Sequence, residues 1–212
     1  MHFRYNRTVA PATTPISVEE AKRQLREVDN DYDTEIAFMV SAATEHADGP
    51  TGVLGRCMVS QTWTVGCDFP AGHGPASAIP IKLGYLQSVV SVSYRDAAGE
   101  LQTLSSNEYA VIAGENGCIY PVSGVAWPDT SKDFIDPVTI TVVVGYPDAG
   151  GSPAEDGLRA NIPDSLRHAF LMHVSHMFEI RDSVALGTIA TKIPQTYDAL
   201  IAPYRITGHG DK

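Results

Sequence analysis

The stretch PDSLRHAFLMHVSHMFEIRD, residues 163–182, carries the strongest helical signal in the chain. Successive residues of an α-helix rotate by about 100°, so the apolar side chains of this stretch occupy an arc of roughly 200°. They are Leu166, Ala169, Phe170, Leu171, Val174, Met177, Phe178 and Ile180. Because one packing partner cannot cover so broad an arc, we predict a helix enclosed by its own bundle and by a neighbouring subunit.

Two shorter helices are predicted nearer the N-terminus. Ser17 and Glu20 have the spacing of a capping box, in which the serine hydroxyl accepts from the glutamate amide and the glutamate carboxylate reaches back. A second helix is predicted over residues 33–48, where Gly49 and Pro50 end it. Phe38 points away from the apolar side of this helix. An isolated exposed aromatic is common, and contact with another subunit is the alternative interpretation.

Between residues 59 and 147 the hydrophobic period changes from helical to two, which is typical of strands. Residues 138–146 alternate valine and threonine before becoming continuously apolar, which predicts a central strand covered on both faces at its end. The hairpin tip at residues 114–117 contains Asn-Gly, which favours positive φ. The other strands are expected at residues 60–69, 79–83, 89–95, 101–104, 109–112 and 118–122.

These signals predict an α+β fold in which a helical hub of three to four helices carries an inserted antiparallel β subdomain. The hub comprises residues 15–58 and 159–205, and the β insertion residues 59–147. Residues 148–158 are expected to be a linker and residues 206–212 a C-terminal tail. Residues 1–14 show no periodicity and contain a proline, so we expect a flexible N-terminal arm that is mobile or docks on a partner.

Composition excludes several classes of protein. The 25 acidic and 15 basic residues give a formal charge of −10, which opposes the phosphate neutralisation on which tight DNA binding depends. An acidic surface would instead let DNA slide past. No apolar run approaches the roughly 20 residues of a membrane-spanning helix, and the N-terminus lacks an apolar signal-peptide core, so synthesis in the cytoplasm without export is expected. The three cysteines lack metal or disulfide spacing.

No catalytic pattern is found. His173, His176 and Glu179 stand one turn apart on the long helix, but a metal site needs further ligands and His173 lies within the apolar arc. We therefore favour a packed histidine over a metal ligand, and expect acidification to destabilise the packing if it is buried and neutral. Nucleophile-elbow, phosphate-loop and zinc-helix motifs do not occur. We predict no enzyme, no catalytic or metal residues and no cofactor.

Aromatic residues of the strand region leave a second function open. Trp63, Tyr85, Tyr94 and Trp127 could line the surface of a carbohydrate-binding or cell-surface-binding module. Aromatic residues on strands are more often core or cross-strand pairs, which is the interpretation we favour.

The C-terminal segment has the spacing of a short amphipathic helix. Tyr197, Leu200, Ile201 and Tyr204 recur at i, i+3, i+4 and i+7, as a helix laid into a partner's groove would require. Folding back onto the chain's own hub is the equally weighted alternative. With Phe38 and Arg205, these four residues are the candidate subunit or partner interface. If they dock on a partner, deletion of residues 194–212 should weaken that attachment and leave the fold intact.

The ordered set of these pieces resembles the head-tail connector, or adaptor, proteins of long-tailed phages and of phage-like gene transfer particles. The resemblance extends from about residue 15 to residue 205, and it depends on the order of soft motifs. The matching pieces are Ile16-Ser17-Val18-Glu19-Glu20-Ala21-Lys22, residues 36–52, Gln87-Ser88-Val89-Val90-Ser91-Val92, Gly145-Tyr146, Pro163-Asp164-Ser165-Leu166-Arg167-His168-Ala169 with His176-Met177-Phe178-Glu179, and Pro203-Tyr204-Arg205.

The resemblance implies a structural subunit of a virion or virion-like particle, made in the bacterial cytoplasm and located at the head-tail junction. It implies a homo-oligomeric, dodecameric ring beneath the portal protein, extending the DNA channel and docking the tail through a tail-side connector or terminator protein. DNA would pass through without sequence-specific binding, and no membrane is involved. The alternative is a β-domain module of a virion that recognises a carbohydrate or a cell surface.

Overall fold

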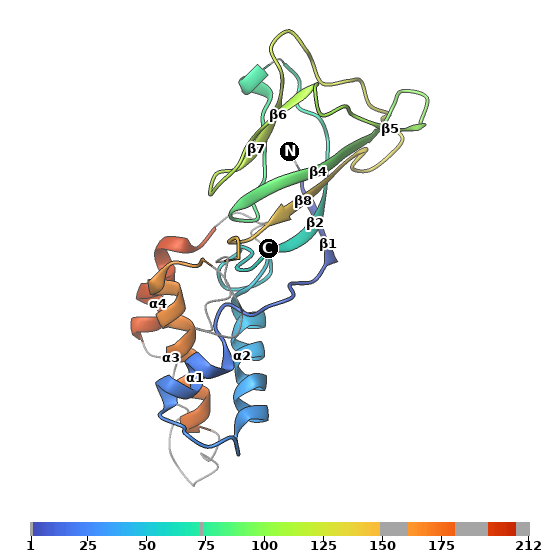
Figure 1. The fold of residues 1–212 in the computed structure, drawn as a ribbon. Coiled ribbons are helices and arrows are strands. Elements are labelled where there is room, and N and C mark those ends of the chain that lie inside the picture. Colours follow the sequence, from blue (N-terminus) through green and yellow to red (C-terminus); the bar gives the residue numbers. More distant parts are fainter. Residues whose placement is uncertain (1, 73, 149–160, 181–194, 207–212) are drawn as a thin grey trace. The chain divides into compact units, whose positions relative to one another are not determined.

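A computed structural model describes residues 2–72, 74–148, 161–180 and 195–206 (Figure 1). The chain divides into two compact units. The β unit is Met1–Ala12 with Ser60–Gly145, and the hub unit is Thr13–Val59 with Tyr146–Lys212. Helices and antiparallel sheets coexist, so the α+β class is confirmed. The linker predicted at residues 148–158 lies outside the described residues except for Asp148, and the tail at 206–212 except for Ile206.

The β unit contains one five-stranded and one three-stranded antiparallel sheet. The five-stranded sheet has the order β1-β2-β8-β4-β5, and its strands are Arg4–Val9, Gln61–Cys67, Val138–Val144, Leu86–Arg95 and Leu101–Thr103. The three-stranded sheet has the order β3-β7-β6, from Ile79–Pro80, Cys118–Pro121 and Tyr109–Ile112. A short 3-10 turn, Gly74–Ser77, precedes β3.

The predicted central strand β8 does lie in the middle of the larger sheet, between β2 and β4. Its side chains alternate between buried and half-buried along the whole strand, with Val142 and Val144 buried and Val143 half-buried. One face therefore packs into the core and the other is only partly covered. The burial expected on both sides at the end of the predicted strand, residues 138–146, begins only where β8 ends, because Val144, Gly145 and Tyr146 are buried in succession.

The N-terminal segment differs from the prediction. Residues Arg4–Val9 form strand β1, which pairs with β2 from Arg4 opposite Gly66 to Val9 opposite Thr62. Five of its six side chains are exposed, so the strand is held by backbone hydrogen bonds and leaves no hydrophobic period in the sequence. An ion pair of 3.2 Å between Arg4 Nε and Asp136 Oδ2 holds its first residue. The prediction of a flexible arm is therefore wrong for these six residues.

The hairpin between β6 and β7 does not have the positive φ that was predicted at Asn116-Gly117. Positive φ, +109°, falls on Gly114, at the first position of the turn. The backbone of Gly117 does not have a positive φ, but a Cβ at this position would clash with the Leu86 side chain. Gly117 is therefore required by the close approach of Leu86, whose backbone N–H also donates to the Gly114 carbonyl at 2.9 Å.

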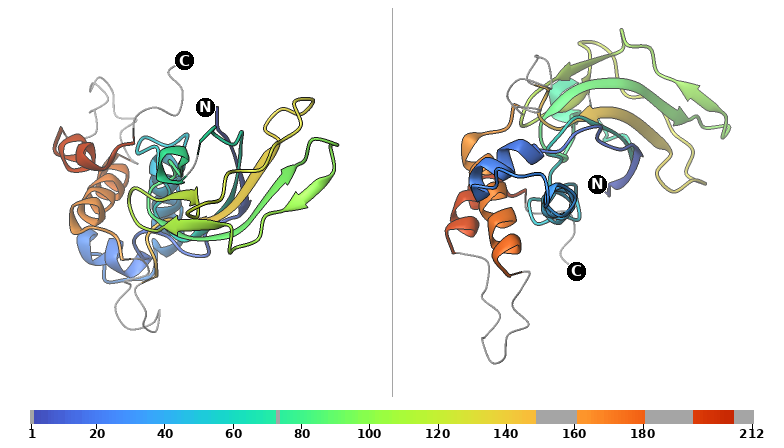
Figure 2. Two further views of the ribbon diagram at one scale, coloured as in Figure 1. Left: turned by 90° about the horizontal axis from the view of Figure 1, so that it is seen from above. Right: turned by 60° about the horizontal axis from the view of Figure 1, so that its bottom comes forward.

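In the described residues of the hub unit, four α-helices form a bundle. Figure 2 shows them from two further sides. They are α1 Val18–Leu25, α2 Asp33–Ala47, α3 Asp164–Ile180 and α4 Gln195–Ile201, and the 3-10 turn Ala202–Tyr204 follows α4. Helix α3 contacts the other three, as its broad apolar arc predicted. The core is Ile16, Ala21, Ile36, Val40, Ala43, Ala47, Leu54, Leu166, Ala169, Phe170, Val174, Tyr197 and Ile201. No helix in the described part of the chain is long and apolar enough to cross a membrane.

Helix α4 packs on α3 within the same chain. Tyr197 and Ile201 are 3% and 1% exposed, so two of the four residues predicted to enter a partner's groove belong to the hub core. The alternative in which this segment folds back onto its own hub is therefore the one that the structure adopts. Removal of residues 194–212 should consequently cost stability, contrary to the expectation from the sequence.

We predict that Ile201→Ala lowers the free energy of unfolding by about 2–5 kcal/mol, the cost of a cavity at a fully buried aliphatic side chain. Urea unfolding followed by circular dichroism measures it. Thr196→Ala, at an exposed position of the same helix, is the matched control and should change stability by less than about 0.5 kcal/mol. Equal, small effects of both variants would contradict the packing of α4 described above.

Candidate functional site

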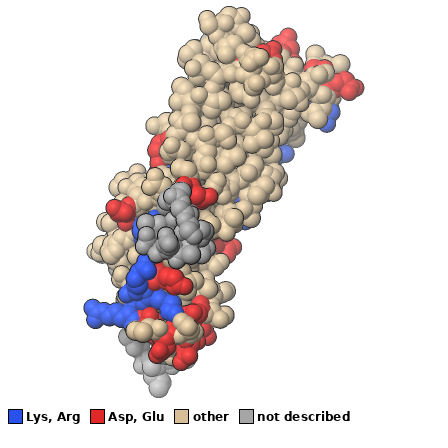
Figure 3. Space-filling model, viewed as in Figure 1, with Lys and Arg blue, Asp and Glu red and all other residues tan. Residues whose placement is uncertain are grey.

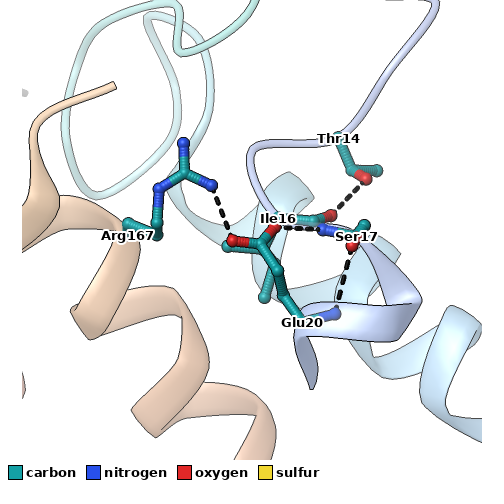
Figure 4. A network of polar contacts seen from close by, with 5 residues as sticks. All are labelled: Thr14, Ile16, Ser17, Glu20 and Arg167. Carbon is teal, nitrogen blue, oxygen red and sulfur yellow. Dashed lines mark hydrogen bonds and ion pairs between the residues drawn. The ribbon is translucent and has the colours of Figure 1, made fainter. Parts of the chain in front are cut away.

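The glutamate of the predicted capping box holds two helices of the hub unit together (Figure 4). Ser17 Oγ accepts from the Glu20 backbone N–H at 3.1 Å, and the Ser17 backbone N–H donates to Glu20 Oε2 at 2.9 Å, which confirms the capping box at the start of α1. The other oxygen, Glu20 Oε1, accepts from Arg167 Nη1 of α3 at 2.8 Å. The two side chains are only 8% and 13% exposed, so this is a nearly buried ion pair.

A second set of contacts ties the C-terminal turn to the same bundle. The hydroxyls of Ser165 and Tyr204 lie 2.9 Å apart. Arg56, whose residue is only 4% exposed, donates from Nη1 to the Tyr204 carbonyl at 3.5 Å, and its guanidinium lies 5.0 Å from the centre of the Tyr146 ring. The backbone N–H of Ile206 donates to the Leu54 carbonyl at 2.8 Å. Four of the motifs that carry the family resemblance thus meet in one unit.

The six candidate interface residues do not form one surface. Tyr197 and Ile201 are buried, and Tyr204 is half-buried and bonded to Ser165. Leu200 is half-buried, and Arg205 is exposed and paired with Asp198 at 2.9 Å. Phe38 on α2 is 75% exposed. Of the six, Phe38, Leu200 and Arg205 are the ones whose side chains can reach a partner in this conformation.

His173 of α3 is packed in the hub, as predicted. His173 is 7% exposed, and its ring makes edge contacts with His46 of α2 at 5.2 Å and with Tyr197 of α4 at 5.3 Å between ring centres. Its Nδ1 is buried without a hydrogen-bond partner. Burial, with smaller contributions from His46 and His176, lowers the pKa of His173 to about 4. Among the described residues no group of three or more His, Cys, Asp or Glu could hold a metal ion.

Of the four candidate aromatic residues of the β unit, the two tryptophans are core residues, and Tyr85 and Tyr94 are half-buried. Trp63 and Trp127 are each 8% exposed, and their indole N–H groups donate to Gln61 Oε1 at 3.0 Å and to the Ser77 carbonyl at 2.8 Å. Phe69 stacks on Trp127 at 4.6 Å and contacts Tyr94 at 5.8 Å. The core interpretation is confirmed for both tryptophans, so the carbohydrate-binding alternative loses two of the four residues that motivated it.

Charged side chains gather unevenly on the molecular surface. Figure 3 shows acidic and basic side chains mixed closely at the lower end of the hub unit, where α1 and the start of α2 lie in Figure 1. Lys22 of α1 pairs with Asp33 Oδ1 at 2.6 Å and donates to Asn30 Oδ1 at 2.7 Å, so part of this charge fixes the turn between the two helices. The visible face of the β unit is largely uncharged, and its acidic side chains lie at the margin.

Sequence reasoning missed Arg56 and the partner of Glu20. A single arginine after a helix end gives no periodic signal, and its contacts with Tyr146 and Tyr204 connect positions about 90 and 148 residues away in the sequence. Arg167 stood in a motif of the resemblance, and its pairing with Glu20, at a separation of 147 residues, could be found only from the fold.

Comparison with known proteins gives a match of fold over the whole chain. No protein-family model matches the sequence, and neither does any curated protein. A chain in the neck of an empty gene transfer agent particle computed with C6 symmetry has a TM-score of 0.67 and 16% identity, covering 98% of this chain and 100% of that one. A chain in the virion of the native particle has a TM-score of 0.64, 16% identity and coverages of 97% and 99%.

A third similar structure comes from the neck of the native particle computed with C12 symmetry, with a TM-score of 0.58, 15% identity and coverages of 98% and 100%. At such identities the likeness concerns the fold. It includes both the hub unit and the β unit, because nearly all of each chain is covered. This chain therefore has the fold of a head-tail neck protein of gene transfer agent particles, as the resemblance in its sequence implied.

The ion pair between Glu20 and Arg167 yields a stability prediction. Glu20→Ala removes half of the capping box and leaves Arg167 without this carboxylate, so we expect the free energy of unfolding to fall by about 3 kcal/mol. Glu19→Ala, one residue away and exposed, is the control, with an expected change below about 0.5 kcal/mol. Urea unfolding at pH 7 compares them. A loss for Glu20→Ala no greater than that of the control would disprove the structural role of the pair.

Burial of His173 yields a prediction of pH dependence. Its pKa is 6.5 in the unfolded chain and about 4 in the folded one, so the folded state favours the neutral ring. The contribution of neutral His173 to the free energy of unfolding is therefore fully present above pH 6.5. It is lost as the pH drops towards 4, by up to about 3 kcal/mol. Thermal unfolding from pH 7 to 4 should show a smaller decline in His173→Gln than in the wild type. Parallel curves for the two proteins would rule out His173 as the source.

Proposed function

We propose that this chain is a structural subunit of the head-tail junction of a virion or virion-like particle, either a phage or a gene transfer particle. In this proposal it is an adaptor that forms a dodecameric ring under the capsid portal, extends the DNA channel and docks the tail. The observation that carries the proposal is the likeness of fold, over 98% of this chain, to a chain in the neck of a gene transfer agent particle.

The symmetry of the similar structures supports the ring. Similar structures come from necks computed with C6 and with C12 symmetry, in which copies of one chain repeat around an axis. A closed ring requires a head-to-tail interface that is the same between all neighbours. The partners that we propose are further copies of the chain, the portal protein above the ring, and a connector or terminator protein on the tail side.

The charge of the chain suits a passage for DNA. Its formal charge of −10 disfavours phosphate binding, so DNA that moves through the ring would meet little attraction. We therefore propose transient passage without sequence-specific binding.

The architecture of the hub unit suits a structural role. Its buried or nearly buried charged residues make contacts within the chain: Glu20 pairs with Arg167, and Arg56 donates to the Tyr204 carbonyl. The proposed role needs no active site or cofactor, and we propose that the protein is not an enzyme. Synthesis in the bacterial cytoplasm followed by assembly into the particle completes the proposal.

For contacts with neighbouring subunits we propose Phe38, Leu200 and Arg205. Phe38 is the strongest of the three, because an aromatic side chain that is 75% exposed on a helix can fill a pocket in a partner. Its exposed neighbours one turn away on α2, Thr34, Glu35 and Ser41, are polar, so Phe38 is the large apolar side chain of this exposed helix surface.

The experiment that tests the proposed function is electron microscopy of particles from cells in which the gene is deleted. We expect tailless heads beside free, finished tails, and joined particles when the wild-type gene is supplied. Complementation with Phe38→Asp should leave most heads without tails, because a buried charge in the interface would oppose association.

Ala37→Asp, which adds the same charge at an exposed position of α2 about 100° around the helix from Phe38, is the matched control and should restore joined particles. Normal joined particles in the complete absence of the gene would overturn the proposed function. Joined particles with Phe38→Asp would instead overturn only the assignment of Phe38 to the interface.

A further inference from the structure

Strand β6 presents an open apolar edge. It is the last strand of the three-stranded sheet, and within the described part of the chain it pairs only with β7. Val111 and Ile112 are 39% and 50% exposed, and Ala113 beside them is also exposed. Proteins usually guard such edges with charged side chains, proline or a covering segment. Residues 110–113, Ala-Val-Ile-Ala, contain none of these side chains, so the edge is ready to pair with another strand.

Strand β1 presents the other long edge of the β unit. It is the first strand of the five-stranded sheet and pairs only with β2 among the described strands. Five of its six residues are exposed, including Val9 at 56%. Figure 1 shows β1 and β6 on opposite sides of the β unit, with β2, β8 and β4 between them.

The two edges differ in charge. Strand β6 is flanked by two acidic residues, Glu108 directly before it and Glu115 in the turn that follows, and no lysine or arginine occurs between residues 96 and 131. Residues 1–12, which contain β1, have two arginines and no acidic residue. Arg4 is paired with Asp136, whereas the exposed Arg7 lies over the Trp63 ring at 6.0 Å. An acidic edge and a basic edge attract each other, and two β6 edges repel.

We infer that the β6 edge of one subunit pairs with the β1 edge of the next copy of the chain, so that the β units join by strand addition around the ring. The inference rests on the proposed function, since it names the contact that would close the proposed ring. Backbone hydrogen bonds supply the affinity in such a contact, and Val111, Ile112 and Val9 supply apolar area. The charge difference fixes which edges meet.

The geometry of symmetric assembly favours this pairing over β6 with β6. Pairing of identical edges is isologous and ends at a dimer, whereas pairing of two different edges on opposite sides of one unit is head-to-tail and can continue until a ring closes. Only the second arrangement repeats around an axis as the similar necks with C6 and C12 symmetry do. The second copy of this chain is therefore the occupant that both charge and symmetry select.

Disulfide cross-linking of purified particles that contain the full chain tests the inference. Asn6→Cys in β1 is combined in turn with Ala110→Cys, Val111→Cys or Ile112→Cys, which samples the possible registers of the strand pair. Cβ atoms opposite each other in neighbouring strands lie about 4.5–5.5 Å apart, near the range a disulfide bridges. Cys118→Ser removes the one native thiol that is not buried, while Cys57 and Cys67 are buried.

On oxidation we expect at least one double variant to give a ladder of covalent dimers, trimers and larger multimers in denaturing gels. Particles in which subunits with Asn6→Cys alone are mixed with subunits carrying the β6 cysteine alone should stop at dimers. Particles that contain the chain as a ring but yield no ladder with any pair would overturn the strand pairing and leave the proposed function standing. Absence of the chain from the particles would overturn both.

A charge placed in the edge gives a second readout. Ile112→Lys should reduce the share of particles that contain the ring at least tenfold, because lysine on an edge strand opposes pairing and adds positive charge opposite the arginine-containing β1 edge. Val90→Lys is the matched control, since Val90 is 60% exposed on β4, which lies inside the five-stranded sheet between β8 and β5. Equal incorporation of both variants would count against the edge contact.

Discussion

The carboxylate of Glu20 is the point on which the hub unit depends. One oxygen closes the N-terminal turn of α1, and the other pairs with Arg167 of α3, 147 residues further along the chain. A nearly buried charge pair contributes little net stability over an apolar pair, but breaking it is costly because it leaves a charge without its partner. The apolar core of the hub then packs around two helices that this pair joins.

The composition of the hub core explains how similar structures can have low sequence identity. The fold is shared over nearly the whole chain at 15–16% identity. Most of the hub core is aliphatic, and such positions tolerate exchange when volume and pattern are kept. Glu20, Arg56 and Arg167 join sequence motifs that are each weak indicators of the fold. These motifs become informative together because the fold brings them into contact.

The parts of the fold that could be predicted are those with a local signal. The capping box at Ser17 and Glu20, the apolar sides of α2 and α3, and the central place of β8 follow from spacing alone. Strand β1 could not be predicted, because an edge strand with exposed side chains has no period. The spacing of Tyr197 and Ile201 suited a partner's groove and the chain's own hub equally, and only tertiary packing decides between such alternatives.

The path of the chain between its two units has a consequence for synthesis. The chain passes from one unit to the other three times, at residues 12–13, 59–60 and 145–146. Strand β1 leaves the ribosome first, yet its partner β2 follows more than fifty residues later, and Arg167 emerges only after the whole β unit. During translation the β unit can therefore be complete while the hub still lacks half of its helices. The hub unit can thus reach its full set of described helices only after α3 and α4 have left the ribosome.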